Sequence, residues 1–220
     1  MRAITSAAAI LIAIGAALLL VSHARAAAQP PPAAQDPCGG RSNNPHVACQ
    51  ADVDKMMAAL PDRAAAKPAK PRKVRVLGRA AGFVHSSIPL AAKTVDALGS
   101  KTGAWTTAIT YDAADVNAAN LKQYDTVFLA STTGCFLDDP NDAAATEARR
   151  AALVDFVRGG KGLAGIHAAS DSYHGSACFG QRGGGGARGA AAPGGPPPVP
   201  GGRPLWPEFN KMIGGYFKFH

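Results

Sequence analysis

The pattern of apolar and polar positions changes near residue 73, where short apolar runs begin to alternate with helical patterns. The apolar runs predict strands at 74–78, 105–111, 126–130 and 162–167. The segments between them space their apolar residues as helices do, and they predict helices at 87–103, 117–124 and 143–158. Strands that are apolar on both faces and alternate with helices indicate a parallel sheet covered on both sides. With right-handed crossovers, the predicted fold class is α/β with a doubly wound, mainly parallel sheet.

The first 26 residues have the pattern of a signal peptide. Met1-Arg2 is followed by an apolar run at 7–21 and by an Ala-x-Ala cleavage pattern that ends at Ala26. This run is short for a hydrocarbon core about 30 Å thick. We therefore expect Sec-type export, no stable membrane span after cleavage, and a periplasmic or secreted protein. An uncleaved N-terminal anchor is the alternative.

Residues 27–72 are expected to precede the folded domain as a cysteine-containing segment and a linker. Cys38 and Cys49 bracket a short polar loop, and an oxidising compartment favours a disulfide between them. Residues 51–60 predict a short amphipathic helix, and the segment 64–73 is basic and contains proline.

The charge of the chain argues against a nucleic-acid partner. The 220 residues carry a formal net charge of +8 at pH 7, but nine basic and only four acidic side chains lie in residues 1–73. The predicted domain is therefore close to neutral. It also lacks the basic stripe with interleaved aromatic residues that is typical of nucleic-acid-binding surfaces.

Small and polar residues follow three of the predicted strands, at the edge where doubly wound sheets bind ligands. The loop after the first strand supplies His85 and Ser86. The loop that follows 126–130 supplies three hydroxyl groups, those of Ser131, Thr132 and Thr133. His167 stands between small residues directly after the last strand, in the place that a nucleophile elbow gives to its exposed side chain. We expect His85 and His167 to meet at this edge.

Three motifs occur in a fixed order along the second half of the chain. They are GFVHSSIP at 82–89, GLAGIHAASD at 162–171, and WPEF with a following IGGYF and His220 at 206–220. Together they resemble the ThuA-like domain, which is named for trehalose utilisation. The resemblance covers residues 73–220 and implies a class I glutamine-amidotransferase-like fold, a flavodoxin-like three-layer sandwich. Family domains usually continue with further strands, so we expect this one to be incomplete at His220.

The resemblance also implies a small carbohydrate as the ligand, either a disaccharide or a keto-sugar. His167 stands where amidotransferase relatives carry a catalytic cysteine, so we expect no glutaminase activity. The hydroxyl groups of Ser86 and of residues 131–133 are candidate substrate-binding groups. Whether the protein is an enzyme stays open, because a non-catalytic ligand-binding or interaction module on the same scaffold is the alternative.

Two kinds of chemistry suit the expected histidine cluster. His85 and His167 can act as acid and base on a sugar hydroxyl or on the C–H beside a keto group, with Asp171 orienting His167 or sharing a metal. Together with His220, the two histidines can instead bind a divalent metal such as zinc. No H-x-x-x-H or H-E-x-x-H spacing supports the metal site, which rests on the predicted topology alone.

A Gly- and Pro-rich insert at 175–204 lies between the motif at 162–171 and the motif at 206–220. Eleven of its thirty residues are Gly and six are Pro, so it has little apolar surface to offset the entropy of ordering. It is either a tolerated insertion or a flap over the ligand edge. Cys135 and Cys178 are both expected at this edge, which favours a second disulfide, although four cysteines allow three pairings.

Overall fold

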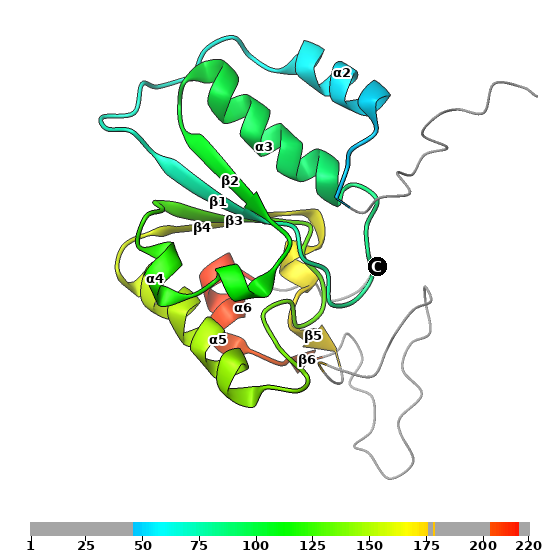
Figure 1. Ribbon diagram of the computed structural model, residues 1–220, viewed down its shortest axis with the longest axis vertical. Helices are drawn as coiled ribbons and strands as arrows, with labels where there is room; N and C mark the ends of the chain where they lie inside the picture. Colours follow the sequence, from blue (N-terminus) through cyan, green and yellow to red (C-terminus); the bar gives the residue numbers. More distant parts are fainter. Residues whose placement is uncertain (1–45, 176–177, 179–202, 216–220) are drawn as a thin grey trace, which may run out of the picture. The chain divides into compact units, whose positions relative to one another are not determined.

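The computed structural model describes residues 46–175, 178 and 203–215 (Figure 1). These residues belong to one compact unit that spans Cys38–His220. The expected signal peptide, Cys38, most of the Gly- and Pro-rich insert and His220 lie outside the described residues.

Four parallel strands form the sheet that organises this unit. They are β1 (Lys73–Leu77), β2 (Thr106–Thr110), β3 (Thr126–Ala130) and β4 (Gly162–Ile166), in the order β2-β1-β3-β4. The chain moves outward from β1 to β2, returns to place β3 on the other side of β1, and then adds β4. This reversal between β1 and β3 is the topological switch point of a doubly wound sheet.

Helices cover both faces of the sheet, which gives three layers (Figure 1). One face carries α3 (Ile88–Thr102), and α2 (Gln50–Ala59) packs against α3. The other carries α4 (Ala118–Leu121), α5 (Ala143–Arg158) and α6 (Pro207–Ile213). The α/β fold class that the alternating pattern predicts is confirmed, and the arrangement is that of a flavodoxin-like sandwich.

Local signals in the sequence set the ends of several helices. The Asp142 carboxylate accepts a hydrogen bond from the Ala145 amide at the start of α5, and the Asn117 side chain caps α4 in the same way. Gly103 ends α3 with a φ of 68°, a conformation that glycine adopts without steric cost. The helix predicted at 117–124 is shorter in the structure, because the chain turns after Leu121 and buries Tyr124 in the core.

Apolar burial is concentrated between the sheet and the α4, α5 and α6 layer. Buried side chains of β3, α5 and α6 pack there with a group of rings in edge-to-face contact. These rings are Phe136, Tyr173, Trp206 and Phe209. A smaller cluster lies beneath α3 and includes Val74, Val76, Ala92 and Ala130. None of the described helices combines the length and the apolar character needed to cross a bilayer.

A second, two-stranded sheet marks the two ends of the Gly- and Pro-rich insert. In it, β5 (His174–Gly175) pairs antiparallel with β6 (Arg203–Pro204). The two ends of the insert therefore lie side by side.

Candidate functional site at the carboxyl edge of the sheet

The carboxyl ends of β1, β3 and β4 bring together the three loops that the sequence singles out. The loop after β1 and the loop after β3 are joined by a parallel bridge between Ala80 and Thr133, and the Ala81 amide donates to the Thr133 carbonyl oxygen at 2.9 Å. They approach so closely that a Cβ on Gly134 would lie 2.8 Å from the Gly82 nitrogen. This contact fixes the loop that carries His85 against the switch point.

His85 and His167 meet at this edge, as the parallel topology predicts. Their ring centroids are 4.5 Å apart and the ring planes are nearly perpendicular. The Phe83 ring contacts the other side of His85 at 4.8 Å. The side chain of His167 is exposed and that of His85 is partly exposed, so the pair is open to solvent and not sealed in the core.

A tight turn after β4 presents His167. The strand ends at Ile166, and His167 begins a short 3-10 helix, η2 (His167–Asp171), with a φ of 56°. Positive φ is uncommon for a residue with a Cβ and is found where surrounding structure enforces it. Gly165 is required here, because a Cβ at that position would lie 2.7 Å from the Ala169 Cβ. The small residues around His167 thus allow the chain to fold back over its own strand.

Burial and nearby charges change the pKa of His85. The pKa of His85 is lowered from its usual 6.5, first by desolvation and then by the neighbouring His167 imidazole, while the Asp171 charge acts in the opposite direction. His85 therefore stays neutral at neutral pH with a free ring lone pair, which is the state that accepts a proton.

Asp171 is near enough to His85 to affect its pKa, but its carboxylate pairs with His174 and not with His167. Its Oδ1 atom is 3.1 Å from His174 Nδ1, and the described residues show no bond between Asp171 and the His167 ring. The described contacts thus place Asp171 with His174, and its expected role beside His167 stays a prediction. Its carboxylate instead holds His174 at the start of β5 and acts on His85 through its charge.

The hydroxyl groups after β3 are buried. Thr132 Oγ1 and Ser172 Oγ share a hydrogen bond of 2.9 Å, and Thr133 Oγ1 donates to the Phe83 carbonyl oxygen at 2.8 Å. Ser131 is also buried and has a φ of 53°. Thr132 and Thr133 thus hold the loops together through these hydrogen bonds, and their expected role in binding sugar stays a prediction. Ser86 is exposed and stays a candidate.

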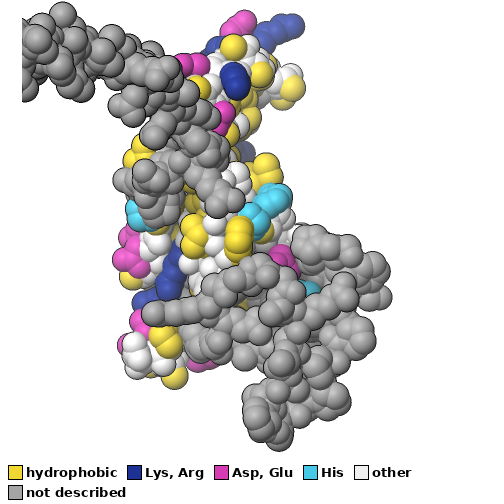
Figure 2. Space-filling view, turned by 90° about the vertical axis from the view of Figure 1, so that its right-hand side faces the viewer, with side chains coloured by type: hydrophobic (Ala, Val, Ile, Leu, Met, Phe, Trp, Pro, Cys, Tyr) yellow, Lys and Arg dark blue, Asp and Glu magenta, His cyan; other side chains and the backbone are white. Residues whose placement is uncertain are grey.

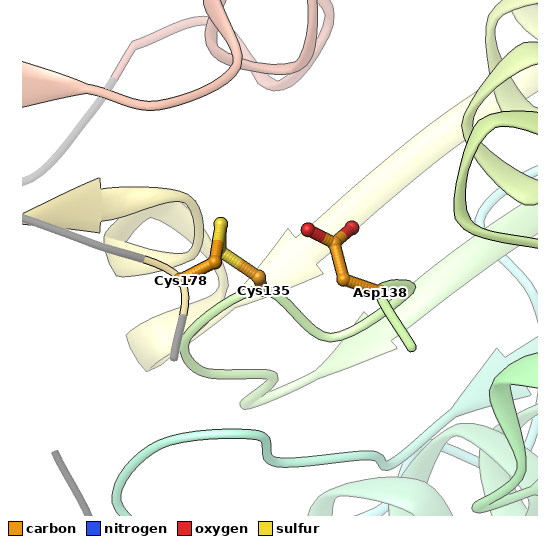
Figure 3. Close-up of side chains that lie close together, drawn as sticks. All are labelled: Cys135, Asp138 and Cys178. Carbon is orange, nitrogen blue, oxygen red and sulfur yellow. A yellow bond between two sulfur atoms is a disulfide. The ribbon is translucent and has the colours of Figure 1, made fainter. Parts of the chain in front are cut away.

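Three potential metal ligands cluster elsewhere in the described part of the chain. These are Cys135, Asp138 and Cys178 (Figure 3). The two cysteines form the expected disulfide, so neither offers a thiolate. Asp138 is held by Arg150, with Arg150 Nε 2.9 Å from Asp138 Oδ1. A disulfide and a neutralised carboxylate do not fit the donor set that zinc prefers.

Two of the three ligands expected for the histidine metal site lie among the described residues. His85 and His167 meet, but the described residues place no third donor with them in a compact group. His220, the third expected ligand, lies outside the described residues.

A buried network that sequence reasoning missed anchors the loop after η2. The Tyr173 hydroxyl donates to Asp138 Oδ1 at 2.8 Å and accepts from the Leu137 amide at 3.0 Å. The Arg150 guanidinium lies over the rings of Tyr173 and Trp206. Burial and the Asp138 charge raise the pKa of the Tyr173 phenol. Asp138 thus serves as the buried acceptor of this anchor.

A cavity of about 420 Å³ lies at the opposite, amino edge of the sheet. Its walls come from the segment 61–68, the end of α3 and the Trp105 side chain, and no histidine lines it. Because ligands of doubly wound sheets bind at the carboxyl edge, we place the candidate site at the histidine pair.

The fold and the site together define a class of protein. It is a doubly wound α/β domain that carries a histidine at the elbow position. The chain belongs to the ThuA family, described as trehalose utilisation, whose pattern matches residues 73–199. The first two motifs lie inside this match, and the motif at 206–220 lies beyond it.

A solved structure from Bacteroides uniformis, named a ThuA-like protein, is similar over part of the fold. It shares 23% identity with this chain, covers 49% of this chain and 41% of its own length, and gives a TM-score of 0.34. The similarity therefore spans less than half of that protein. No curated protein matches the sequence.

Proposed function

We propose that this chain is a carbohydrate-active enzyme of the trehalose-utilisation type that moves protons on a keto-sugar. The observation that carries the proposal is the pair of solvent-accessible imidazoles at the switch point, with centroids 4.5 Å apart and one pKa lowered. A neutral imidazole of lowered pKa is suited to general-base catalysis near neutral pH.

His85 is the general base in this proposal. The proton beside the keto group moves to a ring nitrogen of His85, and the C–H electron pair moves toward the carbonyl oxygen to form an enolate. His167, which contacts His85 and is exposed, donates a hydrogen bond to that oxygen in this proposal. The proton held by His85 exchanges with solvent, and a solvent-derived proton is then delivered from His85 to the same carbon as the enolate collapses to the ketone.

We further propose that the protein acts after export, with a small carbohydrate as its partner. The Cys135–Cys178 disulfide supports this, because structural disulfides persist in oxidising compartments.

The test follows carbon-bound protons of a mono-keto derivative of trehalose in D2O by proton NMR. The wild-type protein should exchange the proton beside the keto group, and His85→Gln should slow this exchange by about 100-fold or more. His46→Gln is the matched control, since His46 stacks on Tyr111 and not on the site pair. It should keep the wild-type rate.

Absence of exchange above the uncatalysed rate with the wild-type protein would contradict the enzyme proposal. If the keto-sugar still bound to the protein under those conditions, the non-catalytic binding module would be the better description.

A further inference from the structure

Exposed hydrophobic side chains are concentrated beside the histidine pair. The described residues expose six large hydrophobic side chains, and three of them are Phe83, Val84 and Ile166. Their exposed fractions are 60%, 54% and 48%. All three lie within two residues of His85 or His167. Exposed apolar groups that gather in this way mark a binding surface, whereas single ones need no explanation.

One of the three side chains contacts a reacting group directly, and the other two are next to a reacting group along the chain. The Phe83 ring contacts His85 edge-on at 4.8 Å, and His85 contacts His167 in turn. Ile166 is the last residue of β4 and pairs in register with Ala130, next to the turn that presents His167. On the face drawn in Figure 2, histidine side chains lie beside hydrophobic ones. We call Phe83, Val84 and Ile166 the apolar rim.

The chemistry of the apolar rim selects an uncharged, non-hydroxylated group. The segments 80–92 and 162–170, which carry the rim, contain no Lys, Arg, Asp or Glu. The three side chains have no atom that can hydrogen-bond a sugar hydroxyl. Their number is also far below the 20–30 residues that each side of a stable protein interface contributes, roughly, which argues for a small group.

We propose that the apolar rim is a subsite for the apolar aglycone, aryl or alkyl, of a glycoside whose sugar ring lies at His85 and His167. The inference rests on the proposed function, because it takes the sugar to bind at the histidine pair. An aryl group on the anomeric oxygen then lies against Phe83 and Ile166, where ring stacking and burial stabilise it.

Calorimetric binding of phenyl α-glucoside and methyl α-glucoside to the full chain tests the subsite. The two ligands share a sugar and differ in the aglycone. The wild-type protein should bind the phenyl compound about tenfold more tightly, since burying a ring contributes at least this much. Phe83→Ser with Ile166→Ser should reduce this ratio to about twofold or less, and the ratio is the quantity read because Phe83 also contacts His85.

Met57→Ser is the matched control, because Met57 is exposed on α2 and lies outside the apolar rim. This variant should keep the tenfold preference. Since Phe83 and Ile166 are exposed, the double variant should fold, and its circular dichroism spectrum checks this.

Three results would overturn the inference. Equal affinity of the wild-type protein for both glucosides would do so while leaving the proton-exchange proposal intact. Failure of both glucosides to bind, with keto-sugar exchange still present, would do so as well. Light scattering that showed a dimer dissociated by the double substitution would assign the apolar rim to self-association instead.

Discussion

The His85 ring lies edge-on to the His167 ring, with centroids 4.5 Å apart, although the two residues follow different strands. Two imidazoles this close oppose double protonation, and burial of His85 adds to the effect. We predict that His85 titrates below 6.5 in the folded protein. His167→Gln should raise the His85 pKa toward 6.5 without restoring it fully, because desolvation is the larger cause. NMR titration of the ring protons measures both values.

Substitution of Asp171 should shift the His85 pKa in the direction opposite to substitution of His167. Its negative charge raises the pKa of His85, so Asp171→Asn should lower that pKa further. The pH at which proton exchange is half lost should shift with the His85 pKa, since only neutral His85 accepts a proton. Activity is lost as pH falls through the folded pKa, so the acidic limit should move to higher pH in His167→Gln and to lower pH in Asp171→Asn. Identical titration curves in the three proteins would show that the rings do not interact.

Gly134 couples the loop of His85 to the loop after β3, and substitution there should disturb the site. Its φ is 62°, and an added Cβ would lie 2.8 Å from the Gly82 backbone nitrogen. Gly160 has a φ of 83° with nothing within 4 Å of an added Cβ, which makes Gly160→Ala a control for backbone strain alone. We expect Gly160→Ala to cost about 1–2 kcal/mol of unfolding free energy. Gly134→Ala should cost about 1–3 kcal/mol more through overpacking.

Urea denaturation measures the two free energies of unfolding. Loss of the His85–His167 contact in Gly134→Ala, seen as a rise of the His85 pKa, would support the role assigned to this glycine. Equal destabilisation by the two substitutions would show that the loops adjust to the extra methyl group.

The sequence predicts the sheet and the meeting of His85 and His167 because both follow from strand periodicity and parallel topology. Apolar runs locate β1, β3 and β4 to within a residue or two, and parallel strands bring their carboxyl ends to one edge. The small residues around His167 predict a tight turn for a local steric reason, which the close approach of Gly165 to Ala169 illustrates.

The roles of the loop side chains could not be predicted, because they depend on distant partners. Thr132 is buried and hydrogen-bonded to Ser172, and Asp171 pairs with His174. No local sequence pattern distinguishes these hydroxyl and carboxylate groups from groups that bind a ligand. Asp138 and Arg150 likewise join through the tertiary fold around Tyr173. Composition and spacing do not encode such contacts.

Arg150 neutralises a carboxylate that has almost no access to water. The Asp138 side chain is 3% exposed, so Arg150→Met leaves a buried charge without its partner. We expect a loss of about 3–5 kcal/mol in unfolding free energy, measured by urea denaturation. Arg149→Met is the matched control on the same helix, because its partner Asp139 is 34% exposed and the pair is long at 3.8 Å. That substitution also removes the Arg149 Nη1 hydrogen bond to the Leu137 carbonyl oxygen at 3.2 Å, so it should cost about 1–2 kcal/mol, less than Arg150→Met. Similar losses in both variants would show that Asp138 reaches water after all.

The disulfide between Cys135 and Cys178 joins the loop after β3 to the segment beyond β5, across a sequence separation of 43 residues. Cys135→Ser with Cys178→Ser should lower the free energy of unfolding by about 2–4 kcal/mol, because the unfolded chain gains freedom. The site itself should persist, since the bonds of Tyr173 to Asp138 and Leu137 hold the same two segments together. Urea denaturation gives the first quantity and the His85 titration reports on the second. A His85 pKa returned to 6.5 in the double variant would show that the disulfide, and not the Tyr173 network, positions the histidine pair.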